Sequence, residues 1–163
     1  MKTYQAIILG AVLSSLVAGR AVAATTLPPV GPNPLGSQSP SASGQLEVFS
    51  QLEGHSEGNN PPWYQHADYY ICDRQGNKLQ QVDNTVGYYA RTPRLVTLPS
   101  GEYVIKSPAK DAFWVKIPVV IRAGYVTKVH LDGNWAVPAS TPEAKVVLSP
   151  SGYPVGWRVA NGQ

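Results

Sequence analysis

The side chains of this chain that are best suited to chemistry are aromatic rings in segments without hydrophobic periodicity. Trp63 and Tyr64 follow two prolines in one such segment, and Tyr88 and Tyr89 lie in another. Loops on a rigid scaffold are where binding residues concentrate, and a flat ring there can stack on a sugar or hold a peptide. These four residues are therefore the candidate ligand-binding site. The alternative is that the rings fold back and plug an open end of the domain.

A second group has the donor types that bind zinc and similar cations. It consists of His55, Glu57 and His66, and imidazole and carboxylate groups are common ligands of such metals. The spacing of the three residues matches no compact metal-binding motif. We therefore expect solvated loop side chains and no cofactor, with a metal site on this group as the alternative.

The chain shows little that could support catalysis. A hydrolase needs a nucleophile beside a base, or two facing carboxylates, in a pocket. The 10 acidic residues are scattered, and no Gly-x-Ser-x-Gly element occurs. His130 is expected on the outer face of a strand, opposite Lys116, as an ordinary exposed histidine. Trp114, Trp135 and Trp157 are expected to belong to the core or to cover sheet edges. A non-enzymatic protein is the prediction.

Two β-hairpins are predicted in the second half of the chain. In the first, Pro99 presets the backbone of a turn and Gly101 supplies its left-handed residue. In the second, Gly124 takes the left-handed position of a three-residue loop, which pairs Ile121 with Tyr125. Apolar residues alternate along both arms of the second hairpin, so one of its faces is expected to point into a core.

The rest of the chain after residue 44 also has the pattern of short strands. A first strand is expected over Gln45–Leu52, an irregular connection over 53–66, and hairpins around 74–77 and 149–152. Helical periodicity is absent. Because a single sheet would leave its apolar face in water, the predicted fold class is all-β, a single antiparallel β-sandwich of about seven to nine strands.

The N-terminus matches a secretory signal peptide. Lys2 is followed by an apolar run and by a small-residue cleavage site at Ala21–Ala23. The run, which Arg20 interrupts, is short of the roughly 20 apolar residues that a spanning helix needs, so we expect cleavage and no membrane span afterwards. The expected organisation is a signal peptide over 1–23, a disordered Pro/Ser/Gly-rich leader over 24–44, and one domain with a C-terminal strand extension over 45–163.

The charge and the cysteine content of the chain limit the kinds of partner and the cellular compartment that we expect. Lys2 and Arg20 leave with the signal peptide, so the 13 basic residues become 11 against 10 acidic ones. A nearly neutral protein without a basic cluster is not expected to bind nucleic acid. Cys72 is the only cysteine, so no intrachain disulfide can form, and its strand setting predicts a small buried hydrophobe. We expect a secreted or periplasmic protein.

One stretch of the chain carries a resemblance to a known family. The run Leu98-Pro99-Ser100-Gly101-Glu102-Tyr103-Val104-Ile105, followed by Ala123-Gly124 and a strand that ends at Val129–Leu131, resembles the latter half of the carboxypeptidase-regulatory-like or transthyretin-like family. Gln45–Leu52 would be the first strand. The resemblance implies a prealbumin-like sandwich core of about seven strands without an active site of its own, used as an accessory, adhesive or ligand-binding module. The ending Val155–Arg158 is similar to that of small secreted bacterial proteins of no established function.

These observations together predict an exported, non-enzymatic binding module of the cell envelope. The leading hypothesis is recognition of a carbohydrate or peptide through the loop aromatics. One alternative is a structural or assembly role, in which exposed edge strands pair with another envelope protein. The other is a metal-dependent enzyme that uses the His/Glu loop group. The oligomeric state stays open.

Overall fold

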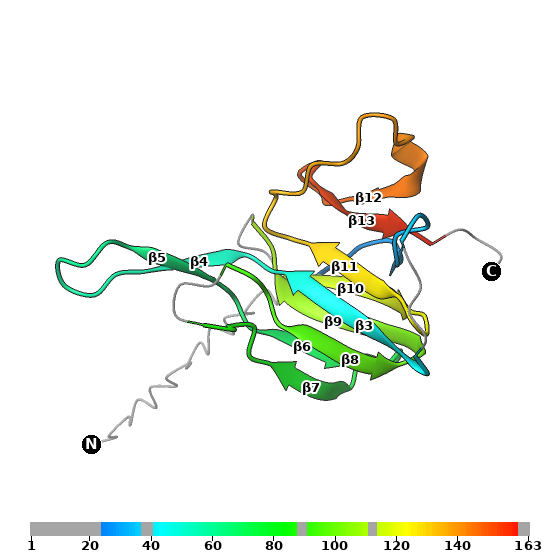
Figure 1. Ribbon diagram of the computed structural model, residues 1–163, viewed down its shortest axis with the longest axis horizontal. Helices are drawn as coiled ribbons and strands as arrows, with labels where there is room; N and C mark the ends of the chain where they lie inside the picture. Colours follow the sequence, from blue (N-terminus) through cyan, green and yellow to red (C-terminus); the bar gives the residue numbers. More distant parts are fainter. Residues whose placement is uncertain (1–23, 37–40, 88–90, 111–113, 160–163) are drawn as a thin grey trace, which may run out of the picture.

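The regular structure of the described residues is almost entirely β-strand, which confirms the predicted all-β class. The computed structural model describes residues 24–36, 41–87, 91–110 and 114–159. Within these ranges it contains thirteen strands and one short 3-10 helix, η1 (Glu143–Lys145). The predicted signal peptide over 1–23 lies outside the described residues. Figure 1 shows the strands as a body of stacked sheets with one long hairpin extending from it.

The larger sheet contains eight strands. They are β1 (Thr25–Thr26), β2 (Val30–Gly31), β6 (Tyr69–Cys72), β7 (Lys78–Val82), β9 (Gly101–Pro108), β10 (Trp114–Ile121), β12 (Val146–Leu148) and β13 (Pro154–Arg158). Their order across the sheet is β12-β13-β2-β10-β9-β6-β7, with β1 also beside β10. Both β1 and β2 run parallel to β10. The sheet is therefore mixed, which corrects the prediction of a purely antiparallel fold.

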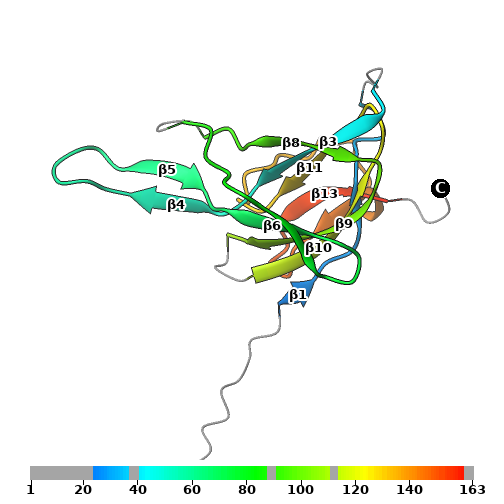
Figure 2. The same cartoon turned by 90° about the horizontal axis from the view of Figure 1, so that it is seen from below.

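Two smaller sheets complete the structure. One has the order β11-β3-β8, from β11 (Val126–His130), β3 (Ser43–Phe49) and β8 (Leu95–Pro99), with β11 parallel and β8 antiparallel to β3. The other is the hairpin of β4 (Leu52–His55) and β5 (Trp63–His66). Figures 1 and 2 show this hairpin projecting away from the other two sheets. The connection over 53–66 was predicted to be irregular throughout, but 53–55 and 63–66 belong to paired strands. Only the turn between them, which contains Gly58 at φ 57°, is irregular.

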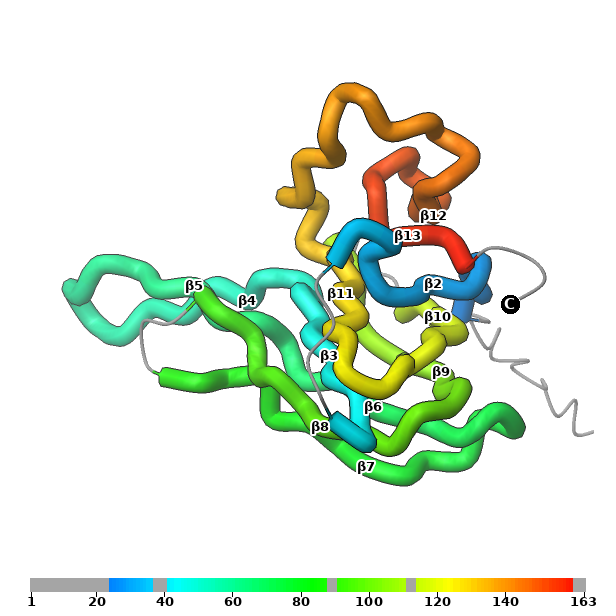
Figure 3. The backbone as a smooth tube through the Cα atoms, turned by 45° about the vertical axis from the view of Figure 1, so that its right-hand side comes forward, coloured from blue at the N-terminus to red at the C-terminus, as the bar shows by residue number. Residues whose placement is uncertain are grey.

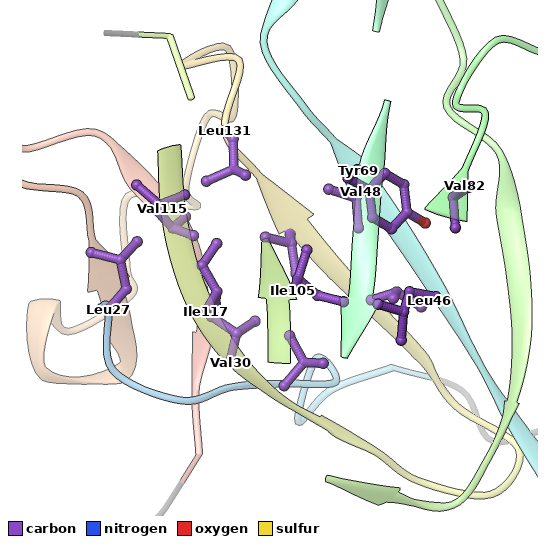
Figure 4. Packing of buried hydrophobic residues seen from close by; sticks show 14 of the residues in the cluster. Leu27, Val30, Leu46, Val48, Tyr69, Val82, Ile105, Val115, Ile117 and Leu131 are labelled. Carbon is purple, nitrogen blue, oxygen red and sulfur yellow. The ribbon is translucent and has the colours of Figure 1, made fainter. Parts of the chain in front are cut away.

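The core lies between the larger sheet and the β11-β3-β8 sheet. Burial alternates along β10, where every second residue from Val115 to Ile121 is buried. The same alternation occurs on β3, with Leu46 and Val48 fully buried. Figure 4 shows side chains from both sheets packed against one another. Such interleaved apolar rows are the main source of stability in a two-layer β fold.

The two hairpins predicted for the second half of the chain are not hairpins. β8 belongs to the small sheet and β9 to the large one, and β10 and β11 are divided in the same way. Each predicted turn therefore carries the chain across the core from one sheet to the other, and β9 pairs with β10 instead. Gly124 has the expected positive φ, 76°, but Gly101 does not lie in the left-handed region. His130 is paired with Phe49, not Lys116.

Part of the segment predicted as a disordered leader belongs to the large sheet. Leu27 and Val30 are buried in the core, and the Leu27 amide donates to the Lys116 carbonyl at 2.8 Å. The pairing is interrupted beside Pro118, which has no N–H to donate, and resumes where Val30 faces Val119. Buried side chains and backbone pairing thus join residues 25–31 to the large sheet, although the composition of this segment suggested a tether.

Three other local predictions are confirmed. β6 and β7 form a hairpin around 74–77 with Gly76 at φ 87°, and β12 and β13 form one around 149–152 with Gly152 at φ 83°. Cys72 is buried and makes no disulfide, as its position on a strand indicated.

Candidate functional site

A pocket of about 430 Å³ lies beside the outer face of β11. Lys128 and His130 point outward there, because they alternate with the buried residues Thr127 and Val129. Four of the lining side chains carry aromatic rings. We call this site the ring pocket, and its lining residues are Asn33, Gly36, Tyr125, Val126, Lys128, His130, Trp135, Ala136, Pro138 and Trp157. The lining residues come mainly from β11 and the chain after it, from β13, and from the chain after β2. Figure 3 shows these segments at the same end of the molecule.

Three rings of the pocket, those of His130, Trp135 and Trp157, form a continuous series of ring contacts with Phe49 of β3. The His130 ring lies between Phe49, at 4.4 Å and 14° from parallel, and Trp135, at 4.9 Å and 12°. Trp157 then meets Trp135 edge to face, at 5.6 Å and 73°. Each geometry is one that aromatic pairs favour. The stack holds the two tryptophans in place before any ligand arrives.

A tight turn after β11 brings Trp135 back over His130. Gly133 at φ 71° makes the reversal, which favours glycine because a Cβ is strained in that conformation. The Asn134 side-chain amide donates to Asp132 Oδ2 at 3.0 Å and stiffens the turn. Trp157 reaches the pocket from β13, which pairs with β2 through Trp157 and Gly31.

The electrostatics of the ring pocket are set by one neutral imidazole and one paired cation. Burial lowers the pKa of His130 from its ordinary value near 6.5 to about 4, and Lys128 and His66 add to this effect while Asp132 opposes it. The ring is therefore uncharged at neutral pH. Lys128 Nζ lies 2.9 Å from Glu47 Oε2, which offsets most of its charge.

The rings predicted to bind a ligand lie elsewhere. Trp63 faces His55 across the β4–β5 hairpin, and the two rings stack at 5.6 Å and 20°. Tyr64 is 42% exposed on the same hairpin, with the Arg91 guanidinium 5.6 Å from its ring. Tyr88 and Tyr89 lie outside the described residues. Trp63 and Tyr64 are therefore on the projecting hairpin and do not line the ring pocket.

The candidate metal ligands are not gathered around one point. His66 is buried at the base of the hairpin, where its Nδ1 lies 2.7 Å from the Ser50 carbonyl and its Nε2 2.9 Å from the Arg91 carbonyl. A carbonyl oxygen thus lies within hydrogen-bond distance of each ring nitrogen, which leaves no room for a metal ion at either. His55 is stacked on Trp63, and Glu57 is exposed in the turn. No three metal-ligating side chains cluster anywhere in the described part of the chain.

The sequence analysis missed the residues that line the ring pocket. It placed Trp135 and Trp157 in the core or at sheet edges, and both are half-buried in the pocket wall. Trp135 and Trp157 come together only because two segments that are far apart in the sequence pack against each other. One local signal was present, the turn sequence Asp132-Gly133-Asn134 directly before Trp135, which predicts a reversal onto the preceding strand.

Comparisons with known proteins give no relative for this chain. No protein-family model matches it, and neither a curated protein nor a solved structure does. Among the residues that the structure describes, no helix has the length and apolar character to span a membrane.

Proposed function

We propose that this protein is a non-catalytic binding module that takes a small carbohydrate in the ring pocket. The observation that carries the proposal is the presence of Tyr125, His130, Trp135 and Trp157 around one pocket of about 430 Å³. Ligand pockets are typically about 300–1,000 Å³, with mostly apolar and aromatic walls and a few polar groups. A sugar presents an apolar C–H face to a ring and hydroxyl groups to polar neighbours.

The polar groups of the ring pocket suit hydroxyl groups. Neutral His130 offers a donor and an acceptor in one ring, and Asn33 adds an amide. The stacked arrangement is fixed before binding, so little side-chain freedom is lost when a ligand is bound. A peptide is the other ligand class predicted from the sequence, and it serves as a comparison in the test.

A glycan array followed by titration tests the proposal. We expect Trp135→Ala to weaken binding of the best carbohydrate at least tenfold, or about 1.4 kcal/mol, because a stacking surface is removed. Intrinsic fluorescence or calorimetry gives the affinity. Trp63→Ala is the matched control, since it removes a tryptophan of the projecting hairpin, and we expect it to leave the affinity unchanged.

The same variants decide between the two aromatic surfaces. Carbohydrate binding that survives Trp135→Ala and is lost in Trp63→Ala would overturn the ring-pocket proposal in favour of the hairpin. Binding of peptides but of no glycan would change the ligand class. Thermal melting of each variant separates loss of binding from loss of folding.

We also propose that the core is a β-sandwich of the prealbumin kind on an exported protein. Seven strands, β3 and β6–β11, supply most of the core cluster between the two sheets, and β2, β12 and β13 add Val30, Val147 and Val155 to it. Seven is the number of core strands that the resemblance to carboxypeptidase-regulatory-like or transthyretin-like proteins implies. Export to the periplasm or outside the cell rests on the N-terminal charged, apolar and small-residue pattern of 1–23.

An assembly role is a second candidate, and the projecting β4–β5 hairpin favours it. A two-stranded ribbon has little stability alone, and this one extends from the body with both edges unpaired by another strand among the described residues. A partner chain could supply the missing contacts. A concentration-dependent oligomer in sizing experiments that disappears when the hairpin is shortened would support this role.

A further inference from the structure

A second, smaller pocket adjoins the ring pocket. Its volume is about 150 Å³, and Asn33 and Tyr125 line both pockets. It lies where the turn between β10 and β11 meets the end of β13. We call it the arginine pocket, and its lining residues are Gly31, Pro32, Asn33, Pro34, Val120, Arg122, Tyr125, Arg158 and Val159.

The arginine pocket carries uncompensated positive charge. In the described part of the chain the ion pairs are Arg74 with Glu102 and Lys128 with Glu47, so neither Arg122 nor Arg158 is held by a carboxylate there. No aspartate or glutamate lines either pocket. Since Glu47 offsets the charge of Lys128, the two arginines supply the net positive charge of the combined site.

Both arginines are placed by the backbone around them. The Arg158 guanidinium donates from Nη2 to the Val146 carbonyl at 3.2 Å, which ties it to β12. Arg158 also lines a further pocket there, together with Val146 and Glu143. Arg122 is half-buried in the turn before β11, where the Tyr125 amide donates to the Arg122 carbonyl at 3.1 Å and the Gly124 amide to the Ser43 carbonyl at 2.9 Å. The remaining N–H groups of two guanidinium forks are the donors that a carboxylate or phosphate group accepts best.

We propose that the ligand of this protein is an acidic carbohydrate, whose ring occupies the ring pocket while its anionic group binds Arg122 and Arg158. This inference rests on the proposed function. Two kinds of acidic sugar have the required oxyanion next to a sugar ring. The oxyanion is a carboxylate in a uronic acid and a phosphate ester in a sugar phosphate. Asn33 and Tyr125 form the junction over which such a ligand extends.

Binding of three related sugars tests the inference. Methyl glucoside, glucuronic acid and glucose 6-phosphate share a pyranose ring and differ in charge. We expect at least one acidic sugar to bind ten times more tightly than the neutral one, and the preference to decrease as salt is raised because exposed charges are screened. The better of the two acidic sugars identifies the kind of anion.

Arginine variants locate the anion. We expect the double variant Arg122→Gln/Arg158→Gln to bind acidic and neutral sugars equally, and Arg122→Lys/Arg158→Lys to restore part of the preference. Arg74→Gln is the matched control, since this exposed arginine pairs with Glu102 on the larger sheet and lines neither pocket. Melting temperatures confirm that each variant is folded.

The outcomes separate this inference from the proposed function. Equal affinity for acidic and neutral sugars, with loss of both in Trp135→Ala, overturns the acidic ligand and leaves the carbohydrate module standing. In a second outcome, binding of an acidic sugar survives Trp135→Ala and is lost in the double glutamine variant. That result supports an anion site at Arg122 and Arg158 and overturns the ring pocket as the place where the sugar ring binds. A preference that survives the double glutamine variant, or absence of binding to all three sugars, overturns the inference.

Discussion

His130 connects burial, ring stacking and charge in a single side chain. It is an outward residue of β11, yet Phe49 and Trp135 cover its two faces at 4.4 and 4.9 Å. Removing water from a ring on both sides disfavours the charged form. The wall of the ring pocket is therefore at its most stable while this histidine is neutral.

Stability of the protein is expected to fall in acid through His130. Its pKa is lowered from about 6.5 to about 4, so the unfolded chain binds a proton at a pH where the native state does not. The contribution is fully present above about pH 6.5 and is lost as the pH falls toward 4, by about 2–3 kcal/mol at most. Chemical denaturation at pH 7.5 and 4.5 measures the loss.

The variant His130→Phe keeps a flat ring in the stack and removes the titration. We expect it to lose less stability than the natural chain between the two pH values. NMR titration of the His130 ring provides the direct check, and a midpoint near 6.5 would contradict the burial argument.

Individual side chains were predictable where burial follows strand periodicity alone. Ile117 and Val119 were assigned to an inward row, and both are fully buried. The surroundings of His130 were not predictable, because Phe49 and Trp135 reach it from other segments. Sequence spacing predicts which face a side chain takes on a strand, but not which segment covers that face.

At the scale of elements, the sequence predicted strands better than their partners. A row of inward apolar residues has the same period whether the next strand is its hydrogen-bonded neighbour or lies across the core. This is why β10 and β11 were predicted as a hairpin although they belong to different sheets. The β6–β7 and β12–β13 hairpins were predicted correctly from short turns that contain Gly76 and Gly152 at positive φ. Such a turn does not by itself decide the pairing, because Gly124 also has positive φ and its turn joins two different sheets.

In the N-terminal segment, amino-acid composition alone did not predict which residues join the sheet. Prolines and serines over 24–44 predicted a tether, but Leu27 and Val30 bury their side chains against β10 and its neighbours. Proline prevents regular pairing only where an N–H is needed. Short paired stretches on either side of Pro28–Pro29 satisfy the backbone while the apolar side chains reach the core.

The turn between β10 and β11 requires a glycine at position 124, and the cost of replacing that glycine can be measured. Gly124 has φ 76°, so Gly124→Val is expected to cost at least about 1–2 kcal/mol, because a β-branched residue resists positive φ. Gly101→Val is the matched control. That glycine lies outside the left-handed region, and an added Cβ there would meet only Tyr103 at ordinary contact distance, 3.6 Å.

Urea denaturation of the two variants gives the comparison. A loss below half a kcal/mol for Gly124→Val, or an equal loss for both variants, would contradict the assignment of the strained position. Gly124→Asn is expected to lie between the natural chain and the valine variant, since asparagine tolerates the left-handed region better than β-branched residues do.

At the scale of the whole molecule, the β4–β5 hairpin is an appendage with a group of hydrogen bonds at its base. The Ser50 hydroxyl donates to the Ala67 carbonyl at 2.6 Å, the Ala67 amide donates to the Gln51 carbonyl at 2.9 Å, and His66 binds backbone carbonyls of two segments. Asn84 adds a donor to the Ser50 hydroxyl oxygen at 3.0 Å. These contacts do not depend on the outer part of the hairpin.

Shortening the hairpin separates the role of the projecting arm from that of the body. Residues 54–64 are replaced by Asn-Gly, a two-residue turn that suits the twist of paired strands, so that Glu53 and Gln65, which face each other in the register, flank it. Because the base contacts and the core are retained, we expect cooperative unfolding with a melting temperature within a few degrees of the natural chain, and carbohydrate affinity in the ring pocket within about twofold. Calorimetry and the sugar titration measure both.

Loss of carbohydrate binding in a folded variant would instead place the ligand on Trp63 and Tyr64, and a large drop in melting temperature would show that the arm stabilises the body from which it projects.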